Sequence, residues 1–104
     1  MKQEKERACK IAKILLQSNE GYLDNVIELW KIGNKLYGQV WDTEFHIFGV
    51  IESDTDHLPT QKVREHCSKE WLEKAEKEIE ECIVFYNKKV IAACNDIIAK
   101  HGNA

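Results

Sequence analysis

The chain has 104 residues, of which 43% are apolar and 32% are charged, and its formal net charge is −3. This length suits one domain with a single modest core, and this apolar content excludes an intrinsically disordered chain. Acidic and basic residues alternate along the predicted helices, as in EKERACK and SKEWLEKAEKEIEE, so we expect no cationic stripe and no direct nucleic-acid binding.

The N-terminal sequence MKQEKERACKIAKILLQ has lysines between its apolar residues. It therefore lacks the apolar run of a secretory signal, and no later stretch is long enough to span a membrane. We expect a cytoplasmic protein whose four cysteines are reduced, and three of the four should be small core residues. Two of them, Cys82 and Cys94, lie twelve positions apart in one predicted helix, about 18 Å along its axis, and cannot pair with each other.

Two short amphipathic helices are predicted in the first third. The first carries a stripe at helical spacing, ended by the turn-prone SNEG: Ala8, Ile11, Ala12, Leu15 and Leu16. The second starts near Tyr22 and places Leu23, Val26, Ile27, Trp30 and Gly33 on one side. A glycine inside a helix costs about 1 kcal/mol relative to alanine. Gly33 therefore either permits close approach of the long C-terminal helix or marks an early end.

The middle of the chain is less regular. The run FHIFGVI is too short for its periodicity to separate a helix from a strand. No alternating partner strand occurs elsewhere, and a lone strand would leave its backbone unpaired. We therefore predict a short helix from Asp42 to Val50, followed by a loop at SDTDHLPT, where Pro59 fixes the backbone.

A long amphipathic helix is predicted from about 69 to 100. Ser68 can cap its start, and Lys100, His101 and Gly102 suit its end. Its apolar face is formed by Leu72, Ala75, Ile79, Cys82, Ile83, Tyr86, Val90, Ala93, Ile97 and Ile98. The sequence thus predicts one all-α domain over 1–104: an antiparallel helical bundle in which two shorter N-terminal helices pack against a long C-terminal helix, with an acidic irregular segment crossing one end.

The acidic residues are unevenly distributed. Between Leu36 and Gln61 there is no lysine or arginine, and the five carboxylates give −5: Asp42, Glu44, Glu52, Asp54 and Asp56. Since the whole chain is −3, the remaining residues sum to +2. Unbalanced like charge is useful where a basic protein surface docks. A solvated acidic loop without a binding role is the alternative.

Other chemistries have weaker support in this segment. Glu52, Asp54 and Asp56 alternate as in a calcium loop, but the glycine and final glutamate of such a loop are missing. Asp54, Asp56 and His57 could form an acid–base set, yet no nucleophile or glycine-rich loop accompanies them. We therefore expect no enzyme and no cofactor.

A metal or small-ligand site is the alternative reading from another functional class. His57, His66 and Cys67 could supply ligands, but they lack the paired spacing of zinc motifs. The long apolar seam of the last helix could also pair with a second copy, so a homodimer is open but not required.

The run FGVIESDTDHLPTQKVREHCSKEWLEKAEKEIEECIVFY, followed by VIAACNDII, resembles a family of small, uncharacterised bacterial helical proteins with a Ser-x-Thr-Asp-x-Leu-Pro loop. The resemblance covers roughly the C-terminal 60 residues and implies a helical protein with no known cofactor. Relatives with this pattern tend to have an aromatic residue in place of Cys67, which argues against an obligatory role for its thiol. The matching positions are Phe48, Ser53, Thr55, Asp56, Leu58, Pro59, Val63, Arg64, His66, Tyr86, Ala93 and Cys94.

In size and charge the chain is also similar to the immunity proteins of contact-dependent growth inhibition systems. That similarity implies an antitoxin role, in which the chain covers the basic active-site cleft of a cognate toxin domain such as a nuclease. The residues expected to bind it are Trp41, Asp42, Glu44, Glu52, Asp54, Asp56 and His57. Asp56 could instead be structural, bracing its own loop or pairing with Arg64.

Overall fold

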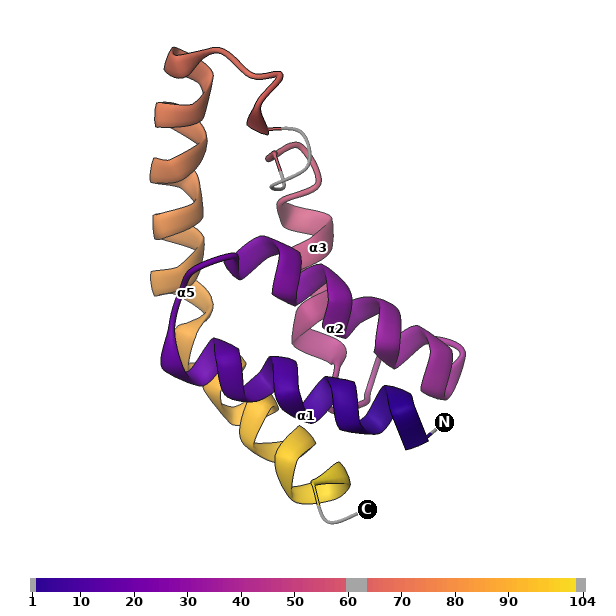
Figure 1. Cartoon of the computed structure of the whole chain (residues 1–104). Helices are drawn as coiled ribbons and strands as arrows, with labels where there is room; N and C mark the ends of the chain where they lie inside the picture. Colours follow the sequence, from indigo (N-terminus) through magenta and orange to yellow (C-terminus); the bar gives the residue numbers. More distant parts are fainter. Residues whose placement is uncertain (1, 60–63, 103–104) are drawn as a thin grey trace.

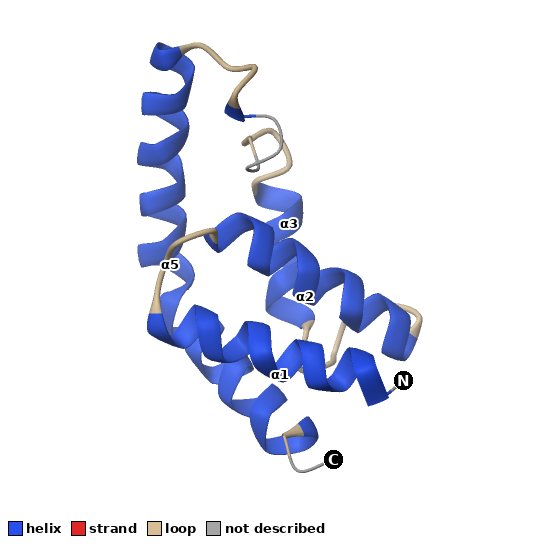
Figure 2. Ribbon diagram, in the orientation of Figure 1, coloured by secondary structure: helices blue, strands red, loops and turns tan. Residues whose placement is uncertain are grey.

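The computed structural model describes residues 2–59 and 64–102. The described residues form four α-helices and no strand (Figures 1 and 2). They are α1 (Lys2–Gln17), α2 (Tyr22–Tyr37), α3 (His46–Asp54) and α5 (Lys69–His101). The prediction of an all-α bundle with two shorter N-terminal helices and one long C-terminal helix is confirmed. Within the described ranges, no helix has both the length and the apolar content needed to cross a membrane.

Helices α1 and α2 lie side by side and run in opposite directions (Figure 1). α1 packs on α5, where the Cys9 thiol lies 3.7 Å from the carbonyl oxygen of Ile97. α2 packs mainly on α1 and α3. The expectation that both short helices pack against the long one is therefore confirmed for α1, whereas α2 meets α5 mainly near the start of α2, where Tyr22 and Ile83 line the same hollow.

A close contact between α2 and the segment before α3 depends on Gly33. A β-carbon on Gly33 would lie 2.7 Å from Phe45 Cβ and 2.8 Å from Val40 Cγ1. Phe45 is fully buried and Val40 is 1% exposed. Gly33 thus permits a close approach, although to this segment and not to the long helix, and α2 continues past it to Tyr37.

The short middle helix starts and ends four residues later than predicted, at His46 and Asp54 in place of Asp42 and Val50. A turn occupies the preceding residues: the Thr43 N–H donates to the carbonyl of Val40, and Asp42 has φ +62°. Aspartate tolerates this left-handed conformation better than most residues. The Thr43 hydroxyl then accepts from the Phe45 N–H. These local hydrogen bonds compete with helix formation and delay its start.

Helix α5 begins and ends almost as expected. The Ser68 hydroxyl accepts a hydrogen bond from the Trp71 N–H, which confirms it as the N-cap. The two halves of α5 differ in burial: Ala75 is the one buried residue before Tyr86, whereas five residues after it are buried (Val90, Ala93, Cys94, Ile97 and His101). The first half extends past α1 and α2 and lies beside the end of α3 (Figure 1). The first half of α5 therefore leaves more of its surface uncovered by the other helices than the second half does.

Candidate docking face

The residues expected to bind a partner fall into two groups at opposite ends of α3. Trp41, Asp42 and Glu44 precede this helix, and the other four lie in its last turns or just after it: Glu52, Asp54, Asp56 and His57. Nine helical residues span about 12 Å along the axis. A single continuous site made of all seven is therefore not what the fold provides.

Glu44 is enclosed within the fold. Its side chain is 2% exposed, and its carboxylate accepts from the Tyr37 hydroxyl at 2.5 Å and lies 3.2 Å from Lys100 Nζ and 3.1 Å from His101 Nε2. The ring of Phe45 stacks on that of His101, with centroids 6.3 Å apart. The expectation that Glu44 contacts a partner is thus corrected: its carboxylate joins the ends of α2 and α5.

The hydrogen bonds around Glu44 set its charge state. Burial alone would raise the pKa of Glu44, but the bonds from Tyr37, His101, the backbone and Lys100 outweigh it and lower the pKa from 4.5 to about 2. The same contact raises the pKa of the Tyr37 hydroxyl to about 12, with burial adding to the effect. Glu44 is therefore ionised near neutral pH, and its negative charge is compensated inside the molecule.

Trp41 and Asp42 form a second local structure. Trp41 is 49% exposed, and its ring packs edge-on against His46 with centroids 5.2 Å apart. The Asp42 N–H donates to His46 Nδ1 at 3.1 Å. Asp42 has a structural role in this turn, while the exposed Trp41 ring remains available for contact with another molecule.

At the other end of α3, the acidic residues meet α5. The Tyr86 hydroxyl donates a hydrogen bond to the Asp54 carboxylate, which raises the pKa of Tyr86 to about 12. His57 Nε2 lies 2.8 Å from a carboxylate oxygen of Glu78. Both contacts hold the end of α3 and the following turn against the first half of α5.

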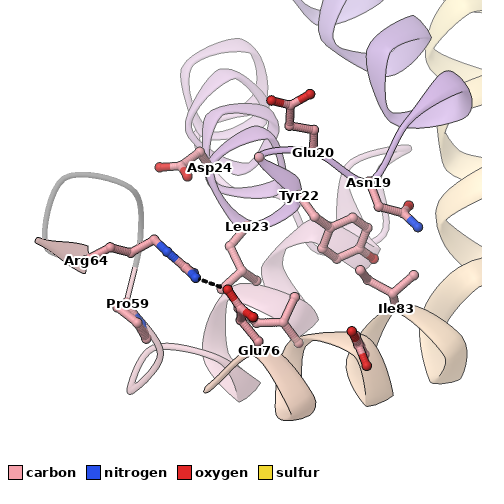
Figure 3. Close-up of a pocket in the computed structure, with 12 residues that line it drawn as sticks. Asn19, Glu20, Tyr22, Leu23, Asp24, Pro59, Arg64, Glu76 and Ile83 are labelled. Atoms are coloured by element: carbon pink, nitrogen blue, oxygen red, sulfur yellow. Dashed lines mark hydrogen bonds and ion pairs between the residues drawn. The ribbon is translucent and has the colours of Figure 1, made fainter. Parts of the chain in front are cut away.

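A first hollow lies between the start of α2 and α5 (Figure 3). It encloses about 430 Å³. Arg64 reaches Glu76 at 2.5 Å across it, so the alternative pairing of Arg64 with Asp56 is not the one observed. The phenol of Tyr22 borders the hollow, and its buried hydroxyl has no hydrogen-bond partner among the described residues. The charged residues that line the hollow are Glu20, Asp24, Glu76, Glu80 and Arg64.

A second hollow lies between the end of α3 and the middle of α5 and encloses about 480 Å³. Its charged lining contains Asp54, Glu78 and Glu81, with no lysine or arginine among the described residues. Phe85 borders it and is 79% exposed. The remaining lining residues are Thr55, His57, Leu58, Cys82 and Tyr86. We refer to Asp54, Glu78 and Glu81 together as the acidic face.

Sequence reasoning missed the contribution of α5 to this face. Counting charges along the chain singled out the segment before Gln61. The glutamates of α5 did not stand out in that count because lysines alternate with them in the sequence of α5. A signal was present: Glu78, Glu81 and Phe85 are spaced i, i+3 and i+7, which places them on one side of a helix. Only the fold brings that side next to Asp54 and His57.

The alternative metal site involved His57, His66 and Cys67. His57 contacts Glu78, and His66 is exposed. No group of three or more His, Cys, Asp or Glu side chains suited to a metal ion occurs within residues 2–59 and 64–102. Val63, a position of the family resemblance, lies outside these ranges.

The cysteines follow the expected pattern. Cys9 and Cys94 are buried in the core, and Cys82 packs against it. Burial raises the pKa of each of these three thiols, most strongly that of Cys94. Three of the four cysteines are therefore small core residues, as predicted.

Comparison with known proteins found no matching family model and no significantly similar curated protein or solved structure.

Proposed function

We propose that this chain is an immunity protein that binds a bacterial toxin domain with a basic surface, such as a nuclease, and covers its active-site cleft. The observation that carries the proposal is the acidic face, on which three carboxylates border one hollow that has no lysine or arginine among its described lining residues. An enzyme that binds phosphates has a positive cleft. Carboxylates held on a folded surface compete for that cleft, and the encounter is accelerated by the opposite charges.

The size of the protein is sufficient for such a complex. A standard stable interface buries about 800 Å² on each partner. The chain exposes 6763 Å² in total, so a complex of this kind would cover about 12% of it. One face of the bundle is therefore enough, and the proposal places the interaction in the cytoplasm, where an imported toxin acts.

The test is co-expression with the product of the neighbouring upstream reading frame, followed by calorimetric titration of the purified pair at low and high salt. We expect a stoichiometric complex whose affinity falls as salt rises, together with loss of toxin activity in proportion to the chain added. Failure to form a complex, or a complex without loss of toxin activity, would overturn the proposal.

A further inference from the structure

The second hollow combines an apolar floor with an acidic border. Leu58 and Tyr86 are 7% and 9% exposed, and the hydrogen bond from Tyr86 to Asp54 fixes the phenol against the end of α3. The Asp54, Glu78 and Glu81 carboxylates surround this floor. A ligand here meets a buried apolar surface and three carboxylates, of which Glu78 also contacts His57.

Phe85 is the second notable feature of this hollow. Its ring packs edge-on against Tyr86, with centroids 4.8 Å apart and planes at 87°, yet 79% of the residue is exposed. An aromatic ring this exposed gains free energy when another surface covers it, about 25 cal/mol per Å² of apolar area. The negative face of the ring also attracts a cation placed over it.

The arrangement selects among ligand chemistries. Three carboxylates repel an anion, and a second copy of this chain would bring like charges together at the same hollow. A guanidinium group pairs with carboxylates through two parallel hydrogen bonds and stacks on an aromatic ring, whereas an ammonium group does neither equally well. Arginine is therefore the side chain that uses the acidic border and Phe85 at the same time.

We infer that the second hollow receives an arginine of the basic partner, with Phe85 stacking on the guanidinium and with Glu78, Glu81 and Asp54 neutralising it. This inference rests on the proposed function for the source of the arginine. It confines the interface, which the sequence predicted over residues from Trp41 to His57, to the junction of α3 and α5.

The chain offers a matched control for each residue tested. Val84 is 80% exposed and adjoins Phe85, but it does not line the hollow. Glu80 adjoins Glu81 and lines the first hollow instead. Phe85→Ala should therefore be compared with Val84→Ala, and Glu81→Gln with Glu80→Gln.

The first measurement is an NMR titration of the full chain and its variants with a short helical peptide of alanine and arginine, alongside the same peptide with lysine. We expect the arginine peptide to bind more tightly and to shift the amide signals of Glu78, Glu81, Cys82 and Phe85. Phe85→Ala and Glu81→Gln should weaken it about tenfold, and the controls less than about threefold. Equal binding of both peptides, or equal loss with Val84→Ala and Phe85→Ala, would overturn the inference.

The same variants separate this inference from the proposed function. Suppose that the chain binds and neutralises the toxin, but that Phe85→Ala and Glu81→Gln have no more effect than their controls. The inferred arginine site is then wrong and the proposed function stands. If the arginine peptide binds in the second hollow and no toxin is neutralised, the proposed function is wrong and the inferred arginine site stands.

Discussion

Two carboxylate sites in this protein have the same side-chain chemistry and opposite surroundings. Glu44 is 2% exposed in its side chain and contacts a phenol, an ammonium and an imidazole of the same chain. At the second hollow, Asp54, Glu78 and Glu81 are exposed at the surface; Tyr86 contacts Asp54 and His57 contacts Glu78, but no lysine or arginine is among the described lining residues. A buried carboxylate requires internal partners because its desolvation is costly. Exposed carboxylates have no such requirement and can be neutralised by another molecule.

The two halves of α5 show the same contrast. The second half is covered by α1 and supplies Lys100 and His101 to Glu44. The first half supplies Glu78 and Glu81 to an open hollow. A single helix thus stabilises the fold at one end and presents charge at the other. Substitutions in the second half of α5 should mainly affect stability, and those in the first half should mainly affect binding.

The largest expected difference is between Glu44→Ala and Glu81→Ala. The first change removes a buried ion-pair partner and leaves His101 and Tyr37 unpaired, so the free energy of unfolding should fall by about 3 kcal/mol. The second removes an exposed charge and should change stability by less than about 0.5 kcal/mol. Urea unfolding followed by circular dichroism measures both. Equal effects would contradict the distinction between the two sites.

Acid should destabilise the Glu44 site specifically. Its folded-state pKa of about 2 lies below the ordinary 4.5, so the ionised group stabilises the fold above that ordinary value, and this stabilisation is lost as the pH falls toward 2. Between about pH 7 and about pH 3 the loss should amount to about 2 kcal/mol. Glu44→Gln should lack this part of the pH dependence. If the Glu44→Gln variant loses as much stability in acid as the unchanged chain, other carboxylates cause the acid destabilisation.

Gly33→Ala should disturb the close packing of α2 on the segment before α3. The added methyl would collide with Phe45 and Val40, at a cost of about 1–3 kcal/mol. Alanine's better helix propensity returns about 1 kcal/mol, so a net loss of about 1 kcal/mol is expected in thermal or urea unfolding. A gain in stability would mean that propensity outweighs the contact and that this packing is looser than the distances indicate.

The smallest expected effect is at Asp42, whose φ is +62°. Asp42→Gly should relieve backbone strain and raise stability by about 0.5 kcal/mol, whereas Asp42→Ala should lower it by about as much. Differential scanning calorimetry of the two variants compares them directly. If glycine and alanine are equivalent there, the turn does not constrain this residue.

The three longer helices were predictable because each has a clear apolar face or cap, whereas α3 was predicted only because no partner strand occurs elsewhere. The periodicity from Leu72 to Ile98 predicted α5, and the Ser68 side chain predicted its start. The start of α3 was placed four residues early, because the turn around Asp42 depends on hydrogen bonds that periodicity does not register. The sequence predicted a close approach as one of two roles for Gly33, but not which segment makes it, because the contacting residues are not adjacent to Gly33 in the sequence.

The candidate site was predictable in part. The residues predicted to bind a partner included Asp54 and His57, which do border the second hollow, but also Glu44, which is buried. Charge is a property of the residue, while its availability depends on which partners the fold places around it. For Glu44 those partners come from positions 37, 100 and 101.

The sequence by itself determined the helical class, the extent of the long helix and the packing of three cysteines in or against the core, because each follows from local spacing or composition. The tertiary structure alone decided which carboxylate is neutralised inside the molecule and which ones form the acidic face. Asp54 and Glu78 are distant in sequence and meet only when α3 packs on α5. The electrostatic energy of a charge depends on the groups around it in space, and those groups become neighbours only when the chain folds.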